Sequence, residues 1–333
     1  MPNFSSPACA ASEPPLACLL EAFAPTVLRL VEDIPVPPRP GEVLLEMLFA
    51  PVNPADRNVL DGTYGSLPAL PATPGNEGCG RVVESNAPSI PEGTLAIPLR
   101  RGTWRRFLTL PASDVVALPG DCPPEQAAML AVNPATAWRL LHDFQSLQPG
   151  DWVVQNAATS GVGRAVVALA RHRGWRTLNL VRRPEAIAEL RSLGADQVEL
   201  ESGPLDARTL CGGHLPRLGL NGVGGASALS VAACLDDGSP HVTYGAMARQ
   251  PLKIPNRFLI FQNLRFHGFW LQHWARTASP DEKQSLYHHL AELLASGQLH
   301  TPVEQIFPLA EIHRALEADA SPTRHGKILL RLS

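Results

Sequence analysis

The sequence predicts an α/β protein made of a β-rich lobe and a doubly wound parallel sheet. Twenty-one of the 33 prolines precede residue 125, and proline is excluded from helix interiors and from central strands. From about residue 135 onward, apolar strands alternate with helices, which is the order of a parallel sheet covered by helices. A chain of 333 residues also exceeds one typical hydrophobic core. Two domains are therefore expected.

Local patterns place the elements. Apolar segments bounded by turn residues indicate strands, and they span residues 42–53, 79–85, 151–156, 176–181, 217–224, 241–245, 264–270 and 326–332. Helices are expected at 161–174 and 184–194, because each pattern ends at a glycine. Ser279 and Glu282 form a capping box at the start of a further helix, residues 279–297.

Composition excludes several classes of protein. Hydrophobic residues make up 45% of the chain and charged residues 18%, which is typical of a globular protein and not of a disordered one. A net charge of −3 gives no basic footprint for nucleic acid. No apolar run reaches the ~18 residues that suggest a membrane span. We therefore expect neither nucleic acid nor a membrane as a partner.

The cysteines and the N-terminal residues bear on the compartment. Six cysteines form no C-x-x-C pair and match no zinc or disulfide framework, so reduced, buried thiols in a cytoplasmic protein are expected. The first fifteen residues carry no Lys or Arg, which argues against a secretory signal and an Arg-rich transit peptide. The 25 Arg against 3 Lys, in a chain rich in Ala and Pro, point to a GC-rich bacterial genome.

A pair of glycines marks a candidate nucleotide site. Gly161 and Gly163 lie between an expected strand and the helix that follows it, although the G-x-G-x-x-G fingerprint is incomplete. Glycines let the backbone approach a pyrophosphate, and a helix N-terminus offers free N–H groups and a positive potential. The alternative is a tight turn without a ligand, and the placement between strand and helix favours the nucleotide.

Two arginines indicate which nicotinamide cofactor binds. Arg182 and Arg183 follow the second strand of the expected sheet, where an NAD enzyme carries Asp or Glu for the ribose 2′-hydroxyl. An arginine instead pairs with a 2′-phosphate through charge-assisted bonds worth roughly 1.5–3 kcal/mol each. We therefore expect NADPH, with Arg182 as the favoured contact. A solvated basic turn is the alternative, above all for Arg183, which precedes Pro184.

These segments resemble the zinc-free medium-chain dehydrogenases/reductases, and most of all the mitochondrial-type 2-enoyl thioester reductases and their bacterial relatives. The similarity runs from about residue 16 to the end and is carried by APVNPADRNVLDGTYG, LPATPGNEG, GTWR, LAVNPATAWRLL, LQPGDWVVQNAATSGVG, VTYGAMARQP, GFWLQHW and GKILL. The resemblance implies a GroES-like catalytic domain, residues 1–134 and 276–333, around a Rossmann NADPH-binding domain, residues 135–275. It also implies a homodimer joined through the Rossmann sheets.

The same resemblance implies an activity and its site. The activity is NADPH-dependent reduction of the C2=C3 bond of a trans-2-enoyl thioester of coenzyme A or acyl carrier protein. Zinc-dependent members carry a histidine where this chain has Asn76, and a four-cysteine lobe that this sequence lacks, so no catalytic metal is expected. Matching positions imply cofactor contacts for Asn133, Thr159, Ser160, Gly161, Val162, Gly163, Arg182, Arg183, Tyr244, Gly245, Ala246, Met247, Phe269, Trp270, Leu271 and Lys327. Pro184 and Ala246 depart from the family pattern, which more often has Arg and Gly there.

Tyr64, one of three tyrosines, matches the proton-donating tyrosine of the family. Hydride addition at the β-carbon leaves an enolate that needs a proton at the α-carbon, and a phenol, protonated at neutral pH, can donate it. Glycine and proline frame its loop and limit its conformations. The residues alone favour a tyrosine packed in the core, whereas the resemblance favours catalysis. Trp270 is likewise expected in the wall of an apolar acyl pocket.

Other interpretations stay open. The arginine-rich segment LRRGTWRRF is equally a solvated basic face or a site for the phosphates of coenzyme A or an acidic carrier protein. A quinone or enone reductase of the same superfamily would share the nucleotide loop, and the GFWL and YGAM segments count against it. A non-catalytic NADPH-binding protein is the third possibility, and Tyr64 in its context counts against that.

Overall fold

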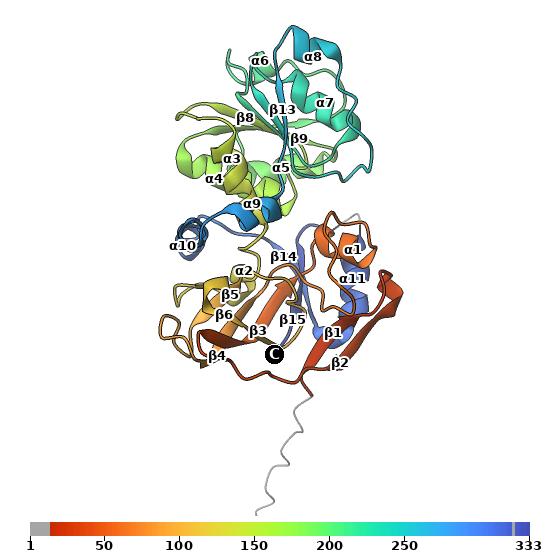
Figure 1. The fold of residues 1–333 in the computed structure, drawn as a ribbon. Coiled ribbons are helices and arrows are strands. Elements are labelled where there is room, and N and C mark those ends of the chain that lie inside the picture. The colour runs from red at the N-terminus through yellow and green to blue at the C-terminus, as the bar shows by residue number, and fades with distance from the viewer. Residues whose placement is uncertain (1–13, 322–323) are drawn as a thin grey trace, which may run out of the picture.

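The computed structural model describes residues 14–321 and 324–333. The chain forms two lobes, each built on its own sheet (Figure 1). The lobe drawn at the top of Figure 1, called the upper lobe below, contains the six-stranded sheet. The lower lobe contains the seven-stranded sheet and a separate two-stranded one. The expected α/β fold class, with a β-rich lobe and a doubly wound sheet, is confirmed.

Both ends of the chain build the lower lobe. Its main sheet has the order β14-β15-β3-β4-β5-β7, with β6 paired to β3. The strands are β3 (Glu42–Pro51), β4 (Cys79–Ser85), β5 (Leu95–Pro98), β6 (Phe107–Pro111), β7 (Val115–Ala117), β14 (Val303–Pro308) and β15 (Lys327–Arg331). The last strand returns antiparallel to β3, so that Leu330 lies opposite Ala50. This pairing brings Lys327 under the loops of the first third of the chain.

Smaller elements complete the lower lobe. An antiparallel hairpin covers one side, and short helices follow the strands: β1 (Leu16–Leu20), β2 (Leu28–Glu32), α1 (Pro54–Leu60), α2 (Pro124–Ala127) and α11 (Ile312–Ala320). Helix α1 begins with a capping box, in which Asn53 is the N-cap and Asp56 returns the bond. For this reason β3 ends at Pro51, whereas the sequence predicted a strand that continues to Asn53.

The upper lobe is a doubly wound parallel sheet. Its order is β10-β9-β8-β11-β12-β13, and its strands are β8 (Trp152–Gln155), β9 (Arg176–Val181), β10 (Gln197–Leu200), β11 (Leu218–Asn221), β12 (Pro240–Thr243) and β13 (Arg265–Gly268). Its helices are α3 (Asn133–Asp143), α4 (Gly161–Arg173), α5 (Glu185–Ser192), α6 (Ala207–Leu210), α7 (Gly225–Ala233) and α8 (Asn256–Ile260). The strand order reverses between β8 and β11, and ligands of such sheets bind at the carboxyl ends of the strands there.

Two helices and a shared core join the lobes. After β13 the chain forms α9 (Leu271–Thr277) and α10 (Pro280–Ala295) before it returns to the lower lobe. One buried cluster contains Ile97 of the lower sheet, Val153 of the upper sheet and Leu290 of α10. Continuous apolar packing of this kind favours a fixed arrangement of the two sheets. Within the described residues, no helix has both the length and the apolar character that a bilayer crossing requires.

Candidate active site

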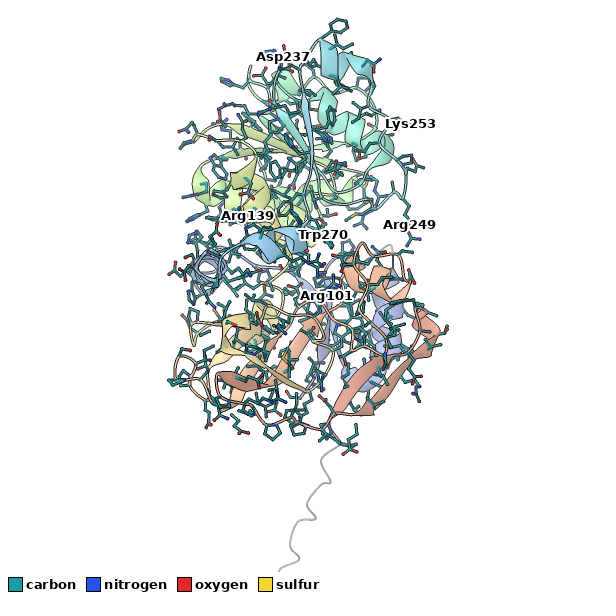
Figure 2. All side chains as sticks on the ribbon, in the orientation of Figure 1. Arg101, Arg139, Asp237, Arg249, Lys253 and Trp270 are labelled. Atoms are coloured by element: carbon teal, nitrogen blue, oxygen red, sulfur yellow. The ribbon has the colours of Figure 1, made fainter. Side chains whose placement is uncertain are left out.

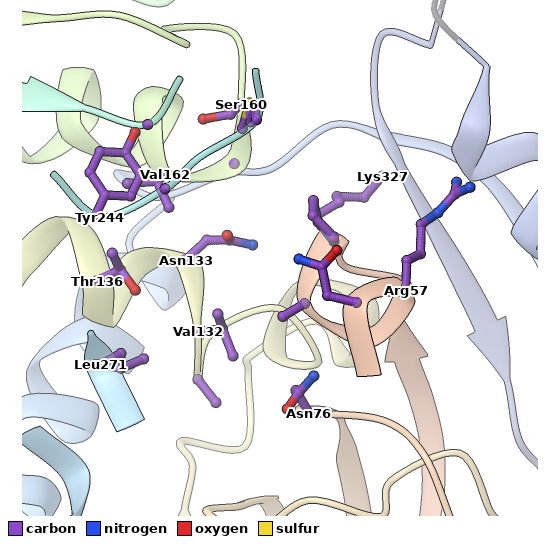
Figure 3. Close-up of a pocket in the computed structure, with 18 of the residues that line it drawn as sticks. Arg57, Asn76, Val132, Asn133, Thr136, Ser160, Val162, Tyr244, Leu271 and Lys327 are labelled. Atoms are coloured by element: carbon purple, nitrogen blue, oxygen red, sulfur yellow. The ribbon is translucent and has the colours of Figure 1, made fainter. Parts of the chain in front are cut away.

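A cleft of about 830 Å³ collects residues from both lobes. Segments after the carboxyl ends of β8, β9, β11, β12 and β13 form one wall, at the point where the strand order reverses. Trp270 lies at the level where the lobes meet (Figure 2). In the close-up, Ser160, Asn133 and Tyr244 lie on one side of the cleft, and Asn76, Arg57 and Lys327 lie on the other (Figure 3).

Most of the residues expected from the sequence line this cleft. They are Tyr64, Asn133, Thr159, Ser160, Gly161, Val162, Arg183, Tyr244, Gly245, Ala246, Met247, Phe269, Trp270, Leu271 and Lys327. Gly163 and Arg182 are not among the lining residues. Both arginines lie in the bend after β9; Arg182 is exposed and its neighbour Arg183 is half-buried. The structure thus places Arg183, and not Arg182, on the wall of the cleft.

Neighbouring atoms lie so close to Gly161 and Gly163 that neither position has room for a larger side chain. Ser160 caps α4, and its hydroxyl accepts a hydrogen bond from the Gly163 N–H at 3.1 Å. A Cβ on Gly163 would lie 2.5 Å from the carbonyl oxygen of Ala158. A Cβ on Gly161 would lie 2.9 Å from the Asn133 side chain. Gly163 therefore lets the first turn of α4 pack against the backbone of the loop after β8, and Gly161 leaves room where the loop meets α3.

Two buried polar atoms of the cleft lack hydrogen-bond partners among the described residues. They are Nδ2 of Asn133 and the hydroxyl oxygen of Tyr244. The Ser160 side chain lies near the Tyr244 hydroxyl but not in hydrogen-bond geometry. Burial also raises the pKa of the Tyr244 phenol, so this group stays protonated. A buried polar group without a partner is costly and rare. Asn133 lies beside Gly161 and Tyr244 lies beside Ser160, so both atoms indicate a polar ligand at this loop, and a dinucleotide fits that requirement.

Tyr64 is held by an indole from the other side of the cleft. Trp270 Nε1 lies 3.0 Å from the Tyr64 hydroxyl oxygen, and the two rings meet edge to face with centroids 6.0 Å apart. An indole N–H can only donate, so the phenol oxygen is the acceptor. The phenol's own hydrogen is therefore left for another acceptor in the cleft. This is the arrangement that a proton donor needs.

A buried polar network lies beneath the cleft floor. Lys327 Nζ donates to Asn53 Oδ1 and, at 3.2 Å, to the Val52 carbonyl oxygen. Asn53 Nδ2 donates to Glu77 Oε1 at 2.8 Å, and the Val132 N–H donates to Glu77 Oε2 at 2.7 Å. Burial raises the pKa of Glu77 to about 7 and lowers the pKa of Lys327. The network joins β15, α1 and the segment that carries Asn133.

Asp56 extends this network toward the cleft wall. Its carboxylate accepts from the Asn53 N–H at 2.8 Å and from Asn76 Nδ2 at 2.6 Å. Burial raises the pKa of Asp56 to about 6. The sequence analysis missed Asp56 and Glu77. The segment NPAD after an apolar strand is a capping-box pattern, and it would have predicted that the Asp56 carboxylate lies at the start of a helix.

Cationic residues of the cleft were also missed. Arg164 is buried; it donates to the Thr159 carbonyl oxygen at 3.0 Å and to the His325 carbonyl oxygen at 3.2 Å, and pairs with Glu189. It therefore ties the loop after β8 to the segment before β15. The other cleft cations not anticipated there are Arg57, Arg249 and Arg324. No local motif marks them, because distant segments bring them together.

Comparison with known proteins decides the family. The model of the alcohol dehydrogenase GroES-like domain matches residues 39–120, and that of the zinc-binding dehydrogenases matches residues 161–289. The mitochondrial enoyl-[acyl-carrier-protein] reductase of Rattus norvegicus is 42% identical over 293 residues, which cover 85% of this chain and 79% of the relative. The Homo sapiens protein of that name is 42% identical over 305 residues, 88% of this chain and 82% of the relative. The chain belongs to this enoyl reductase family.

Solved structures agree with that assignment. A complex of Etr1p with NADP and crotonyl-CoA has a TM-score of 0.84 and 28% identity, covering 95% of this chain and 99% of that one. A mycobacterial quinone oxidoreductase has a TM-score of 0.83 and 26% identity, covering 95% and 99%. The expected family and the expected GroES-like and Rossmann pair of folds are thus confirmed.

The expectation of a cytoplasmic, bacterial protein is wrong. The relatives named above are mitochondrial proteins of eukaryotes. An excess of Arg over Lys reflects nucleotide composition, which does not separate bacterial from eukaryotic genes. Cysteines without a disulfide framework indicate a reducing environment, and that does not single out the cytoplasm. The N-terminal residues on which the argument against a transit peptide depended lie largely outside the described residues.

Proposed function

We propose that this protein reduces the C2=C3 double bond of a trans-2-enoyl thioester with NADPH. The observation that carries the proposal is the Tyr64 phenol, whose oxygen accepts from Trp270 while its hydrogen stays free for the cleft. The relatives named enoyl-[acyl-carrier-protein] reductase and the neighbour bound to NADP and crotonyl-CoA support the substrate class. The thioester is one of coenzyme A or of acyl carrier protein.

The mechanism follows from what each side chain can do. NADPH, when bound, supplies a hydride for the β-carbon. Tyr64 gives its proton to the α-carbon as general acid. The Trp270 N–H then stabilises the negative charge left on the phenol oxygen, because a hydrogen bond to a charged acceptor is stronger than one to a neutral acceptor. Phe269 and Leu271 exclude water from the same wall of the cleft.

Several cleft residues would hold the cofactor. The loop of Thr159, Ser160, Gly161 and Val162 at the N-terminus of α4 suits a pyrophosphate. Asn133 and Tyr244 offer unpaired polar atoms to the nicotinamide half. Arg183 lines the cleft and can pair with the 2′-phosphate there. Arg182 does not line the cleft, so it can contact the phosphate only from outside the wall. Lys327 lies at the opposite side of the cleft.

We also propose metal independence, the expected domain limits and a homodimer. Asn76 stands where a zinc ligand would be needed, and its amide nitrogen donates to Asp56, an arrangement that does not suit a metal. Zinc at one equivalent per purified chain, measured by mass spectrometry, would overturn metal independence.

The two sheets support limits of 1–134 and 276–333 for one domain and 135–275 for the other.

NADPH oxidation followed by absorbance tests the activity. We expect turnover with crotonyl-CoA and longer 2-enoyl thioesters, little with a simple quinone, and less with NADH than with NADPH. The quinone is the necessary comparison, because a mycobacterial quinone oxidoreductase shares this fold. Turnover of the quinone alone would replace the proposed function by quinone reduction.

A further inference from the structure

The arginine-rich segment is not one basic face. Arg100 pairs with Asp114, Arg105 with Asp33 at 2.5 Å and Arg106 with Glu46 at 2.8 Å. Among the carboxylates that the structure describes, none pairs with Arg101. Arg101 alone of these arginines therefore has a full positive charge that no carboxylate offsets. It lines the cleft and lies at the level where the lobes meet (Figure 2).

Arg101 contacts both sides of the Tyr64–Trp270 pair. One guanidinium nitrogen donates to the Ser66 carbonyl oxygen at 2.7 Å, two residues beyond Tyr64. The other terminal nitrogen donates to Gln272 Oε1 at 2.7 Å, two residues beyond Trp270. The guanidinium carbon also lies 5.0 Å from the centroid of the Tyr64 ring. One rigid group thus touches the tyrosine ring, the tyrosine loop and helix α9.

One other side chain of α9 reaches the Tyr64 loop, since Arg276 donates to the Ser66 hydroxyl oxygen at 3.2 Å. The N–H groups of Thr63 and Tyr64 share one acceptor, the Asn58 carbonyl oxygen, at 2.8 and 3.1 Å. Beyond Tyr64, exposed and half-buried residues alternate up to Leu70. The planar fork of an arginine fixes two acceptors at once, which lysine cannot do. Arg276 bonds only a side-chain hydroxyl of the loop, whereas Arg101 bonds the loop backbone and α9 at the same time. The backbone that carries the phenol is therefore held against α9 chiefly by Arg101.

We propose that Arg101 is a positioning residue for protonation. It holds the Tyr64 loop against α9, so that the phenol keeps its bond to Trp270 and its hydrogen stays directed at the substrate carbon. Its charge also favours the negative charge that develops on the phenol oxygen as the proton leaves. This inference rests on the proposed function, because it assigns Arg101 a task only if Tyr64 donates a proton.

A double-mutant cycle tests the proposal. Wild type, Arg101→Gln, Tyr64→Phe and the double variant are compared for kcat and KM with NADPH and crotonyl-CoA. We expect Arg101→Gln to lower kcat about 10–100-fold with KM for NADPH within about twofold, since a misplacement of about 1 Å can cost 10²-fold. In the Tyr64→Phe background the same change should cost less than about twofold, because its target is gone. Arg101→Lys should recover part of the loss through its charge.

The controls separate this proposal from its alternatives. Arg39→Gln, an exposed arginine outside the cleft, should leave kcat unchanged, and the melting temperature of each variant reports folding. Equal losses in both backgrounds, or an Arg101→Gln enzyme as active as wild type, would overturn the inference. A loss confined to KM for crotonyl-CoA, and absent for crotonyl-N-acetylcysteamine, would make Arg101 a phosphate contact instead. Failure of the proposed function shows separately, as a wild type without enoyl thioester turnover.

Discussion

At the scale of single residues, the chemistry depends on which partner donates in the Tyr64–Trp270 pair. Because the indole must donate, replacing Tyr64 by Phe removes the acidic hydrogen and leaves the ring in place. We expect Tyr64→Phe to lose about 10²–10⁴-fold in kcat and to keep its affinity for NADPH, measured by fluorescence titration. Tyr287→Phe is the matched control, since that hydroxyl also belongs to the cleft but donates to the Ala131 carbonyl oxygen. Unchanged turnover in Tyr64→Phe would remove this residue from the mechanism.

Glu77 makes stability depend on pH, again through a single group. Burial raises its pKa from 4.5 to about 7, although the nearby Lys327 charge opposes the shift. Between these pH values the unfolded chain gives up the proton and the folded chain keeps it. The folded state therefore loses stability as pH rises, by up to about 3 kcal/mol once the pH exceeds the folded pKa.

The variant Glu77→Gln cannot ionise, so its stability lacks this pH dependence. Its lost hydrogen bond adds an offset that does not change with pH. We expect the melting temperature of wild type to fall relative to that of Glu77→Gln between about pH 5 and pH 8. Exposed Glu84 on β4 provides the control Glu84→Gln. A difference between wild type and Glu77→Gln that stays constant across this range would contradict the buried-acid interpretation.

At the scale of elements, the sequence predicts what short-range patterns determine. Helix α4 and strands β8 and β9 could be predicted, because an apolar strand, a glycine turn, a helix with a glycine stop and a second apolar strand follow one another within residues 151–181. Strands β5 and β7, of four and three residues, could not. Their pairing comes from partners distant in sequence, and proline-rich segments carry no period-2 signal long enough to read.

The contact between Gly163 and the loop before α4 predicts the effect of adding a side chain at the start of this helix. A Cβ on Gly163 would meet the Ala158 carbonyl oxygen at 2.5 Å, and backbone cannot move aside cheaply. We expect Gly163→Ala to lower stability by about 1–3 kcal/mol and to weaken NADPH binding, as measured by thermal unfolding and fluorescence titration. Gly120→Ala is the control, since nothing lies within 4 Å of its Cβ position. Equal melting temperatures of the two variants would show that the loop adapts.

At the scale of the whole molecule, the site is more than its motifs. Tyr64, Gly161 and Trp270 belong to recognisable segments, so they could be predicted. Arg101 and Arg164 could not, because their roles exist only once the tyrosine loop meets α9 and the loop after β8 meets the segment before β15. The acceptors of these two arginines lie far from them in the sequence, and only the folded chain brings donor and acceptor within hydrogen-bond distance.

The edge strand of the upper sheet bears on how two copies of the chain assemble. Strand β13 is the last strand of that sheet. Ile260 and Phe261, a few residues before β13 in the chain, are 68% and 80% exposed. An unpaired edge beside apolar side chains is a template for pairing with a second copy, which would extend the two parallel sheets across a twofold axis. We expect a dimer mass by light scattering for wild type and a shift toward monomer for Phe261→Asp. Ile34→Asp, a change at a 70% exposed residue of the lower lobe, should stay dimeric. A monomeric wild type, or equal masses for both variants, would contradict this interface.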